Sequence, residues 1–158
     1  MGTEQRQENE GQSAARMRIA VFRLSRRLRP TKAAGTLTTT EVDVLVAAER
    51  RGPVRLSGLA GFTGLNPTML SRLVPKLEEA QLIRRLPDET DRRACLVEVT
   101  GKGRRLLERV RSERNDLLSR RLSLLSADQR RALSEAVPVL EELAELLLEN
   151  DLTRAGTR

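Results

Sequence analysis

The sequence predicts a mostly α-helical protein with a minor β component, organised around a winged helix-turn-helix. Two short amphipathic segments, joined at Thr63-Gly64, come directly before two β-prone segments that flank a turn. Longer apolar-periodic helices are expected on both sides of this module, within residues 13–35 and 101–150. The chain of 158 residues has the length of one domain, and we place the winged module at residues 36–100.

The N-terminal end is expected to start as a disordered tail and to continue as a helix. Residues 1–12 are polar and rich in Glu and Gln, a composition that does not support a packed core. From Ser13 to Leu28 apolar residues recur at helical spacing, and Pro30 ends the helix. The apolar seam consists of Met17, Val21, Leu24 and Leu28, with Ile19 and Phe22 beside it.

A capping box predicts where the second helix begins. Thr38 and Glu41 have the spacing at which each side chain bonds the backbone N–H of the other. The helix is expected to run to about Arg51, because Gly52-Pro53 then breaks it. Val54-Arg55 is a candidate third strand that pairs with the wing.

The helix-turn-helix follows directly. Gly64 supplies the left-handed backbone conformation that a tight turn between helices requires. Asn66 as N-cap and Pro67 at the first helical position are strong signals that the second helix of the motif starts here. Pro75 is expected to kink or shorten that helix, because it removes a backbone hydrogen bond. The inward-facing apolar residues of the two helices are Leu56, Leu59, Ala60, Leu65, Leu70, Leu73, Val74 and Leu77.

The outer face of the second helix carries short hydroxyls and cations, which suit hydrogen bonds to the base edges and phosphates of DNA. Arg72 is the candidate for a base contact, preferably with guanine, whose major-groove edge accepts two parallel hydrogen bonds. Thr68 and Ser71 are expected to make lesser contacts, since a hydroxyl forms single hydrogen bonds. The predicted DNA-binding residues of this helix are Asn66, Pro67, Thr68, Ser71, Arg72 and Lys76.

A β-hairpin is predicted next, with strands at Leu82–Leu86 and Ala94–Val99 and a turn-rich segment between them. Arg92 and Arg93 lie where the ribbon returns, and Arg93 is a candidate minor-groove contact because a narrow groove concentrates negative potential. Asp91 is expected to brace the Arg93 guanidinium through a bidentate ion pair. The alternative is a solvated hairpin with ordinary charges, which the adjoining helix-turn-helix disfavours.

Two further capped helices complete the chain. Thr100 caps a long helix that is expected to reach about Leu124, and Ser126-x-x-Gln129 is a capping box for a last helix through about Leu148. Residues 151–158 are expected to form a short polar tail. The apolar residues are Leu106, Leu107, Val110, Leu117 and Leu118 on the long helix, and Leu133, Ala136, Val137, Leu140, Leu143, Ala144 and Leu147 on the last.

The apolar faces of the first and last helices predict a homodimer. One winged module cannot cover both faces, and soluble proteins avoid exposed apolar patches of this size. Packing against a symmetry mate covers them, so we assign residues 13–35 and 101–150 to a dimerisation domain. The alternatives are that the terminal helices pack on their own module or that the chain is a coiled-coil scaffold. Pro138 and the lack of sustained heptads disfavour the scaffold.

Composition favours a polyanionic partner and disfavours catalysis. The net charge is +7 with a pI near 11.0, and Phe22 and Phe62 are the only aromatic residues. RNA and single strands are usually bound on aromatic platforms, so duplex DNA is the favoured partner. The absence of histidine removes the commonest general base and metal ligand, and we expect no enzyme activity, metal or cofactor.

The single cysteine and the distribution of apolar residues narrow the function further. Cys95 alternates with Val97 and Val99 on the returning strand, where a half-buried thiol is more typical of packing than of redox sensing. No apolar run is long enough for a membrane span or a signal peptide, so we expect a cytoplasmic, nucleoid-associated protein with no membrane partner.

Several motifs together resemble the MarR family of bacterial transcriptional regulators, over about residues 13–148. The most specific are D-x-R at Asp91–Arg93 and V-x-V-T-x-x-G at Val97–Gly103. The more widely shared pieces are Leu56–Ala60, Gly64-Leu65, Leu70–Val74 and Leu77-Glu78. The resemblance implies homodimers that bind pseudo-palindromic duplex DNA, usually as repressors, and an effector that is often a small aromatic or amphipathic acid or an oxidant. It does not assign the effector-binding residues.

The function predicted is therefore a ligand-responsive, sequence-specific repressor. Two alternatives stay open: a non-sequence-specific architectural or replication-type winged-helix protein, and a protein–protein interaction module. A regulator binds its inverted repeat far more tightly than random duplex, which distinguishes it from both alternatives.

Overall fold

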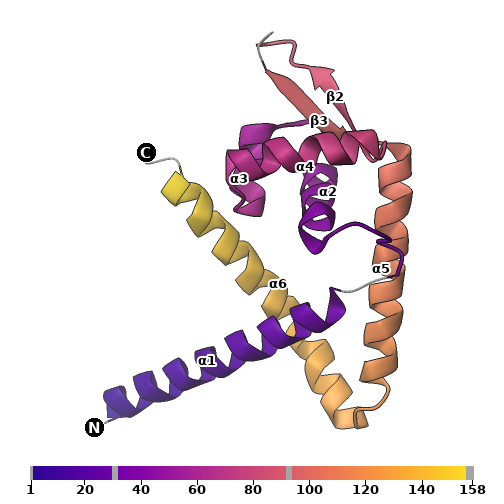
Figure 1. Cartoon of the computed structure of the whole chain (residues 1–158). Coiled ribbons are helices and arrows are strands. Elements are labelled where there is room, and N and C mark those ends of the chain that lie inside the picture. Colours follow the sequence, from indigo (N-terminus) through magenta and orange to yellow (C-terminus); the bar gives the residue numbers. More distant parts are fainter. Residues whose placement is uncertain (1, 30–31, 92–93, 156–158) are drawn as a thin grey trace.

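The computed structural model describes residues 2–29, 32–91 and 94–155 as helices joined to one small sheet (Figure 1). The predicted winged helix-turn-helix is confirmed, with α3 and α4 followed by the β2–β3 hairpin. The elements are α1 (Gly2–Leu28), α2 (Thr39–Arg51), β1 (Val54–Arg55), α3 (Leu56–Thr63), α4 (Pro67–Glu79), β2 (Ile83–Pro87), β3 (Cys95–Val99), α5 (Gly101–Leu122) and α6 (Ala127–Ala155).

The sheet is antiparallel, with the strand order β1-β3-β2. Val54 pairs with Val97, so the short strand before α3 joins the wing as the sequence predicts. Ile83 pairs with Val99 at the base of the hairpin, and Pro87 pairs with Cys95 toward its tip. The sheet therefore ties the start of the helix-turn-helix to β3, and through β3 to the other wing strand.

The hydrophobic core lies in the winged module and continues onto the first turns of α5. Gly103 on α5 sits against the end of the helix-turn-helix, since a Cβ atom at this position would lie 2.2 Å from the Leu82 carbonyl oxygen. A side chain does not fit there. The buried apolar residues are Val42, Val44, Leu45, Ala48, Leu59, Leu70, Val74, Leu77, Leu82, Ile83, Val97, Val99, Leu106, Leu107 and Val110.

The predicted helix starts are confirmed by their hydrogen bonds. Both bonds of the capping box are present at Thr38 and Glu41, and again at Ser126 and Gln129. The side chains of Asn66 and Thr100 each accept a hydrogen bond from the backbone N–H three residues later. Gly64 adopts the left-handed conformation, with φ of 67°. Local side-chain chemistry thus fixes where most helices begin.

Both ends of the chain differ from the sequence expectation. α1 begins at Gly2, so residues 2–12 are helical where the composition predicts a disordered tail. α6 continues to Ala155, into the predicted polar tail, and it passes through Pro138 without ending. Glu, Gln and Arg are good helix formers, and residues 2–12 contain no proline to stop a helix that forms at Ser13.

The winged module lies at one end of the molecule and the helices α1 and α6 cross at the other, with α5 connecting the two ends (Figure 1). Beyond the core residues, polar contacts farther along α5 hold it to α2 and to the segment before α2. Arg111 forms an ion pair with Glu49 of α2, and the Glu113 carboxylate accepts a hydrogen bond of 3.0 Å from the Ala33 N–H. Over the residues described, no helix has the length and apolarity needed to cross a bilayer.

Candidate DNA-binding surface

The core fixes the orientation of α4. Leu70, Val74 and Leu77 are fully buried, which turns the opposite side of the helix outward. The side chains of Thr68 and Arg72 lie on this outer side and form no hydrogen bond or ion pair with a described residue. They are therefore free to contact a ligand. The six residues predicted for this helix, Asn66, Pro67, Thr68, Ser71, Arg72 and Lys76, are all exposed.

Hydrogen bonds within α4 restrict what two of these side chains can do. The Asn66 Oδ1 accepts from the Met69 N–H at 2.8 Å, so its amide nitrogen is the part left to donate to DNA. The Ser71 hydroxyl donates to the Pro67 carbonyl at 2.8 Å, so its oxygen is left as an acceptor. In this rotamer Ser71 can accept from a base amino group and cannot donate to a phosphate.

The expectation that Pro75 shortens α4 is wrong, because the helix continues to Glu79. Pro75 lacks an N–H and so leaves the Ser71 carbonyl without its helical partner. Both residues are exposed, and water can bond that carbonyl at little cost. The proline is tolerated because it lies on the outer side of the helix.

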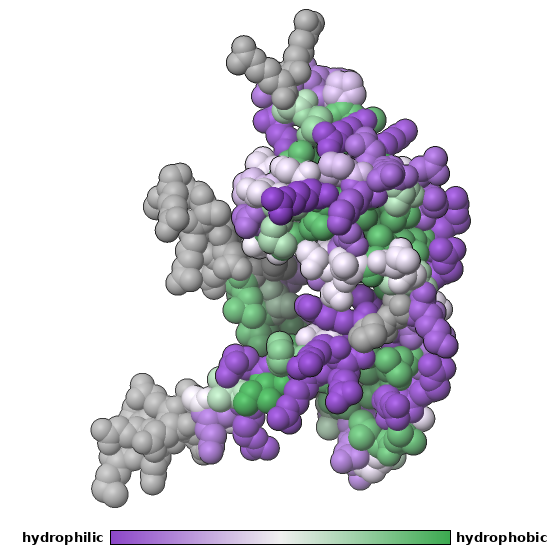
Figure 2. Space-filling model, viewed as in Figure 1, coloured by the Kyte–Doolittle hydropathy of each residue, from purple (hydrophilic) through white to green (hydrophobic). Residues whose placement is uncertain are grey.

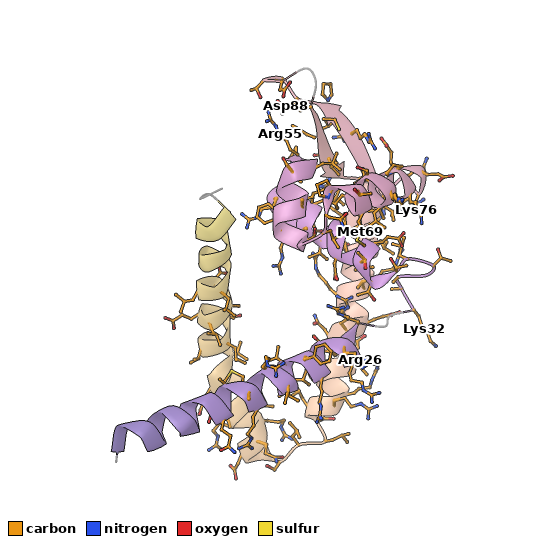
Figure 3. The ribbon with its side chains drawn as sticks, turned by 60° about the vertical axis from the view of Figure 1, so that its left-hand side comes forward. Arg26, Lys32, Arg55, Met69, Lys76 and Asp88 are labelled. Atoms are coloured by element: carbon orange, nitrogen blue, oxygen red, sulfur yellow. The ribbon has the colours of Figure 1, made fainter. Side chains whose placement is uncertain are left out.

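Met69 is an exposed α4 residue that lies outside the set predicted from the sequence. Its side chain is 43% exposed and lies on the same flank of α4 as Lys76 (Figure 3). A methionine on a groove-facing helix can contact the C5-methyl group of thymine. The signal was present in the sequence as an apolar residue outside the buried stripe.

A cluster of polar side chains lies toward the tip of the wing, just beyond the end of β2. Arg55, on β1, contacts the Asp88 carboxylate at 2.6 Å and the Thr90 hydroxyl at 3.1 Å (Figure 3). The same carboxylate accepts from the Thr90 N–H at 2.9 Å and from the Thr90 hydroxyl at 2.6 Å. Asp88 is 6% exposed, whereas Arg55 and Thr90 are exposed, and we call these three hydrogen-bonded residues the wing network.

These hydrogen bonds favour the ionised form of Asp88. Bonds from the Thr90 hydroxyl and backbone N–H, and then the Arg55 guanidinium, lower the pKa of the carboxyl group from 3.8 to about 2. Burial acts in the opposite direction but is outweighed. The carboxylate is therefore charged throughout the neutral range and holds the wing turn in place.

The wing network differs from the brace that the sequence suggested. Arg92 and Arg93 lie outside the described residues, so the Asp91–Arg93 pair stays a prediction. Asp88-x-Thr90 has the pattern of an Asx-turn and could have been noticed. Its link to Arg55 could not, because the two residues are far apart in sequence and only the sheet brings them together.

Two ion pairs involve residues of the wing strands. Glu78 of α4 and Arg85 of β2 lie 3.1 Å apart, which joins the recognition helix to the first wing strand. Arg84 and Glu98 lie 2.6 Å apart across the β2–β3 pair. Both pairs are accessible to solvent, and each adds little stability. The first links the hairpin to α4, and the second links the two strands of the hairpin to each other.

Comparison with known proteins identifies this arrangement. A model of the MarR family matches residues 37–95. A crystal structure of a putative transcriptional regulator from Pseudomonas aeruginosa superposes with a TM-score of 0.76 at 31% identity, covering 87% of this chain and 96% of that one. The chain belongs to the MarR family.

Other relatives agree with this assignment. An HTH-type transcriptional regulator of Mycobacterium leprae is 26% identical over 138 residues, which is 87% of this chain and 96% of the relative. The HTH-type transcriptional regulator PecS of Dickeya dadantii is 38% identical over 81 residues, about half of each chain. This MarR-family protein is accordingly a transcriptional regulator and not an enzyme.

The MarR-family chain also has two small hollows that are lined in part by α2. One, of about 400 Å³, lies between α2 and α3, and Arg29, Arg50 and Asp43 contribute to its wall. In the same hollow the Arg51 guanidinium stacks on Phe62, 3.9 Å from the ring centre. The other hollow, of about 270 Å³, lies between α1, α2 and α5.

Cys95 is half-buried on β3, as its alternation with Val97 and Val99 predicts. Within the described ranges, no three Cys, Asp or Glu side chains gather in a way that could hold a metal ion. The features of the MarR-family chain that point to a ligand are therefore the α4 surface, the wing and the hollows.

Proposed function

We propose that this regulator is a homodimer that represses transcription by binding a pseudo-palindromic operator in duplex DNA. The observation that carries the proposal is the outer side of α4, where Thr68, Arg72 and Lys76 are exposed beside a wing whose Asp88 is held by Arg55. A helix of this kind fits the major groove, and a wing beside it reaches the adjacent minor groove.

Exposed apolar residues on α1 and α6 support the dimer. Phe22 is 62% exposed, Leu24 57% and Leu147 62%, although each belongs to the apolar face of its helix. Figure 2 shows apolar surface where α1 and α6 cross. A two-fold partner would cover these faces and would also match the symmetry of an inverted repeat.

Each protomer would read one half-site. Arg72 would contact a guanine, while Thr68, Ser71 and Lys76 would contact bases or phosphates nearby. Asn66 and Pro67 would set the entry of the helix into the groove. On the wing, Arg92 and Arg93 would approach the minor groove, with Asp91 as the brace of Arg93.

Repression would be relieved by a small aromatic acid. The hollow with Arg29, Arg50, Arg51 and Phe62 offers guanidinium groups for a carboxylate and a ring face for an aromatic group. A MarR-family protein of Mycobacterium tuberculosis, 23% identical and with a TM-score of 0.58, is solved as a complex with p-aminosalicylic acid. We therefore propose an aromatic carboxylate as effector and the bacterial cytoplasm, where the chromosome lies, as the site of action.

The experiment is a competition between two DNA duplexes of equal length and composition. One carries an inverted repeat from the region upstream of the gene, and the other is the same sequence scrambled. We expect the repeat to be bound at least about a thousandfold more tightly at physiological salt. Equal affinities would contradict sequence-specific regulation and would favour an architectural winged-helix protein.

A further inference from the structure

Met69 places a large apolar side chain on the outer surface of α4. The leucine and valine side chains of this helix point into the module and are buried or half-buried: Leu70, Leu73, Val74 and Leu77. Met69 is instead 43% exposed and does not belong to the hydrophobic core. Covering such a side chain removes apolar surface from water, which is favourable. Met69 is therefore available to a ligand that binds on this side of the helix.

The N-cap of α4 fixes the point from which this side chain projects. The Met69 N–H donates to the Asn66 Oδ1 at 2.8 Å and lies 3.1 Å from the Asn66 carbonyl oxygen, so the residue is held in the first turn of the helix. In helix-turn-helix proteins the N-terminal residues of the second helix contact the base edges in the major groove. A side chain at this position of α4 would reach the bases of a docked duplex.

Met69 shares one stripe of α4 with two cations. At about 100° per residue, Lys76 lies about 20° and Arg72 about 60° from Met69 around the helix axis. Both cations are exposed. An apolar protein surface that covered Met69 would also have to desolvate the two charges, whereas DNA offers them phosphates and base acceptors. The stripe therefore favours duplex DNA as the partner that covers Met69.

The chemistry of the side chain selects the base. The thioether sulfur is a weak hydrogen-bond acceptor, so Met69 is poorly suited to a polar base edge. Of the four bases, thymine is the one that presents an apolar group in the major groove, its C5-methyl group. The flexible methionine side chain can adapt its shape to such a group. Contact between the two would remove apolar surface of both from water.

We propose that Met69 makes this regulator specific for a thymine in each half-site, through contact with the C5-methyl group. The inference rests on the operator binding proposed above and adds a base that is recognised without a hydrogen bond. Arg72 follows Met69 by three residues, a rise of about 4.5 Å along the helix, which is close to the base-pair spacing of about 3.4 Å. The thymine should therefore lie in the base pair next to the guanine that Arg72 contacts.

The test removes the methyl group and leaves the hydrogen bonds of the base pair unchanged. Each thymine of the inverted repeat is replaced in turn by deoxyuridine, at the equivalent position of both half-sites, and the affinity is measured by fluorescence anisotropy at constant salt. At one such position we expect the unchanged chain to bind about fourfold more weakly for each methyl group removed. This position should adjoin the base pair at which Arg72→Ala relaxes the preference.

Substitution of Met69 shows whether this side chain contacts the methyl group. Met69→Ala should bind the thymine operator at least about fourfold more weakly per half-site, and deoxyuridine should then cause no further loss. Met69→Leu keeps an apolar side chain of similar size and should retain most of the preference for thymine. Circular dichroism shows whether each variant is folded.

The matched control is Leu124→Ala. Leu124 is 74% exposed and lies in the turn between α5 and α6, at the end of the molecule away from α4 (Figure 1). Its loss removes an exposed apolar side chain of similar size from a place that DNA on α4 does not reach. Leu124→Ala should bind the operator as the unchanged chain does, with the same loss on replacement of thymine.

The failures of the two proposals are distinguishable. Equal affinity of the unchanged chain for the operator and its scrambled duplex would refute operator binding, and the role of Met69 with it. Specific binding that no deoxyuridine weakens would refute the role of Met69 alone. A deoxyuridine penalty that persists in Met69→Ala would do the same, because the methyl group would then act through another residue or through the shape of the DNA. A sensitive thymine several base pairs from the Arg72 position would contradict the shared stripe.

Discussion

Arg72 is the residue on which the proposed sequence specificity depends most. It is exposed on the outer side of α4, and in the described part of the chain its guanidinium has no partner to give up before binding. Arg72→Ala should cost about 1–3 kcal/mol per half-site and should relax the preference at one base position. Fluorescence anisotropy on operators substituted at each position measures both effects.

Arg109→Ala on α5 is the control, because it removes an equal charge from an exposed site outside the reading helix. A loss that is uniform across all operators for Arg72→Ala would mean that the residue contacts phosphate and not a base.

Asp88 gives the wing a defined pH dependence. Its pKa is lowered from 3.8 to about 2 in the folded chain, so folding favours the carboxylate. The stabilisation is complete above about pH 4 and disappears as the pH falls toward about 2. Asp88→Asn should therefore unfold at lower urea concentration than the unchanged chain at neutral pH, and the difference should shrink in acid. Glu89→Gln, an exposed neighbour, should show no such trend.

A constant difference between the Asp88→Asn and unchanged chains across this pH range would contradict the network. Urea unfolding, followed by circular dichroism at a series of pH values, gives the result.

At the scale of elements, the helix starts were predictable and the wing contacts were not. Thr38, Asn66, Thr100 and Ser126 cap helices through bonds to residues within a few positions, and such local chemistry can be read from sequence. The wing network joins Arg55 to Asp88 across the sheet. These two residues are far apart in the sequence, so no short sequence motif includes both of them. Long-range pairings follow from the packed fold.

The terminal helices illustrate the opposite error. Polar composition predicted a tail at residues 1–12, although Glu, Gln and Arg make up most of this segment, are good helix formers, and are accompanied by no proline. The apolar periodicity of the terminal segments correctly predicted helices there. Many of the apolar side chains of these helices are exposed in a single chain. For these helices, the spacing of apolar residues predicted the secondary structure better than the overall polarity of the segment did.

The junction between the wing and α5 depends on Gly103. A Cβ atom there would lie 2.2 Å from the Leu82 carbonyl oxygen, which belongs to the backbone and cannot rotate away. Gly103→Ala should lower the free energy of unfolding by about 1–3 kcal/mol, as overpacking does in other cores. Thermal unfolding measures it. Gly61→Ala, with nothing within 4 Å, is the matched control and should not destabilise the chain. Equal effects of the two changes would contradict the close contact.

At the scale of the whole molecule, the net charge of +7 predicts a salt-dependent affinity for DNA. If the two protomers contact several phosphates, the logarithm of the affinity should fall linearly with the logarithm of salt concentration, by about 0.9 per contact. Lys76→Ala removes one proposed contact from each protomer and should make the slope shallower by about 2 per dimer. Affinity that does not change with salt would argue against a duplex-DNA partner.

The measurement that tests the account most directly varies the spacing of the operator's half-sites. A dimer that reads both half-sites from one face of the duplex requires them to be about one helical turn apart, 10–10.5 base pairs. Inserting about five base pairs turns one half-site to the opposite face, and the affinity should fall to that of a single half-site. Inserting a full turn should restore part of it. Affinity that is unchanged by the half-turn insertion would contradict a two-fold dimer that reads an inverted repeat.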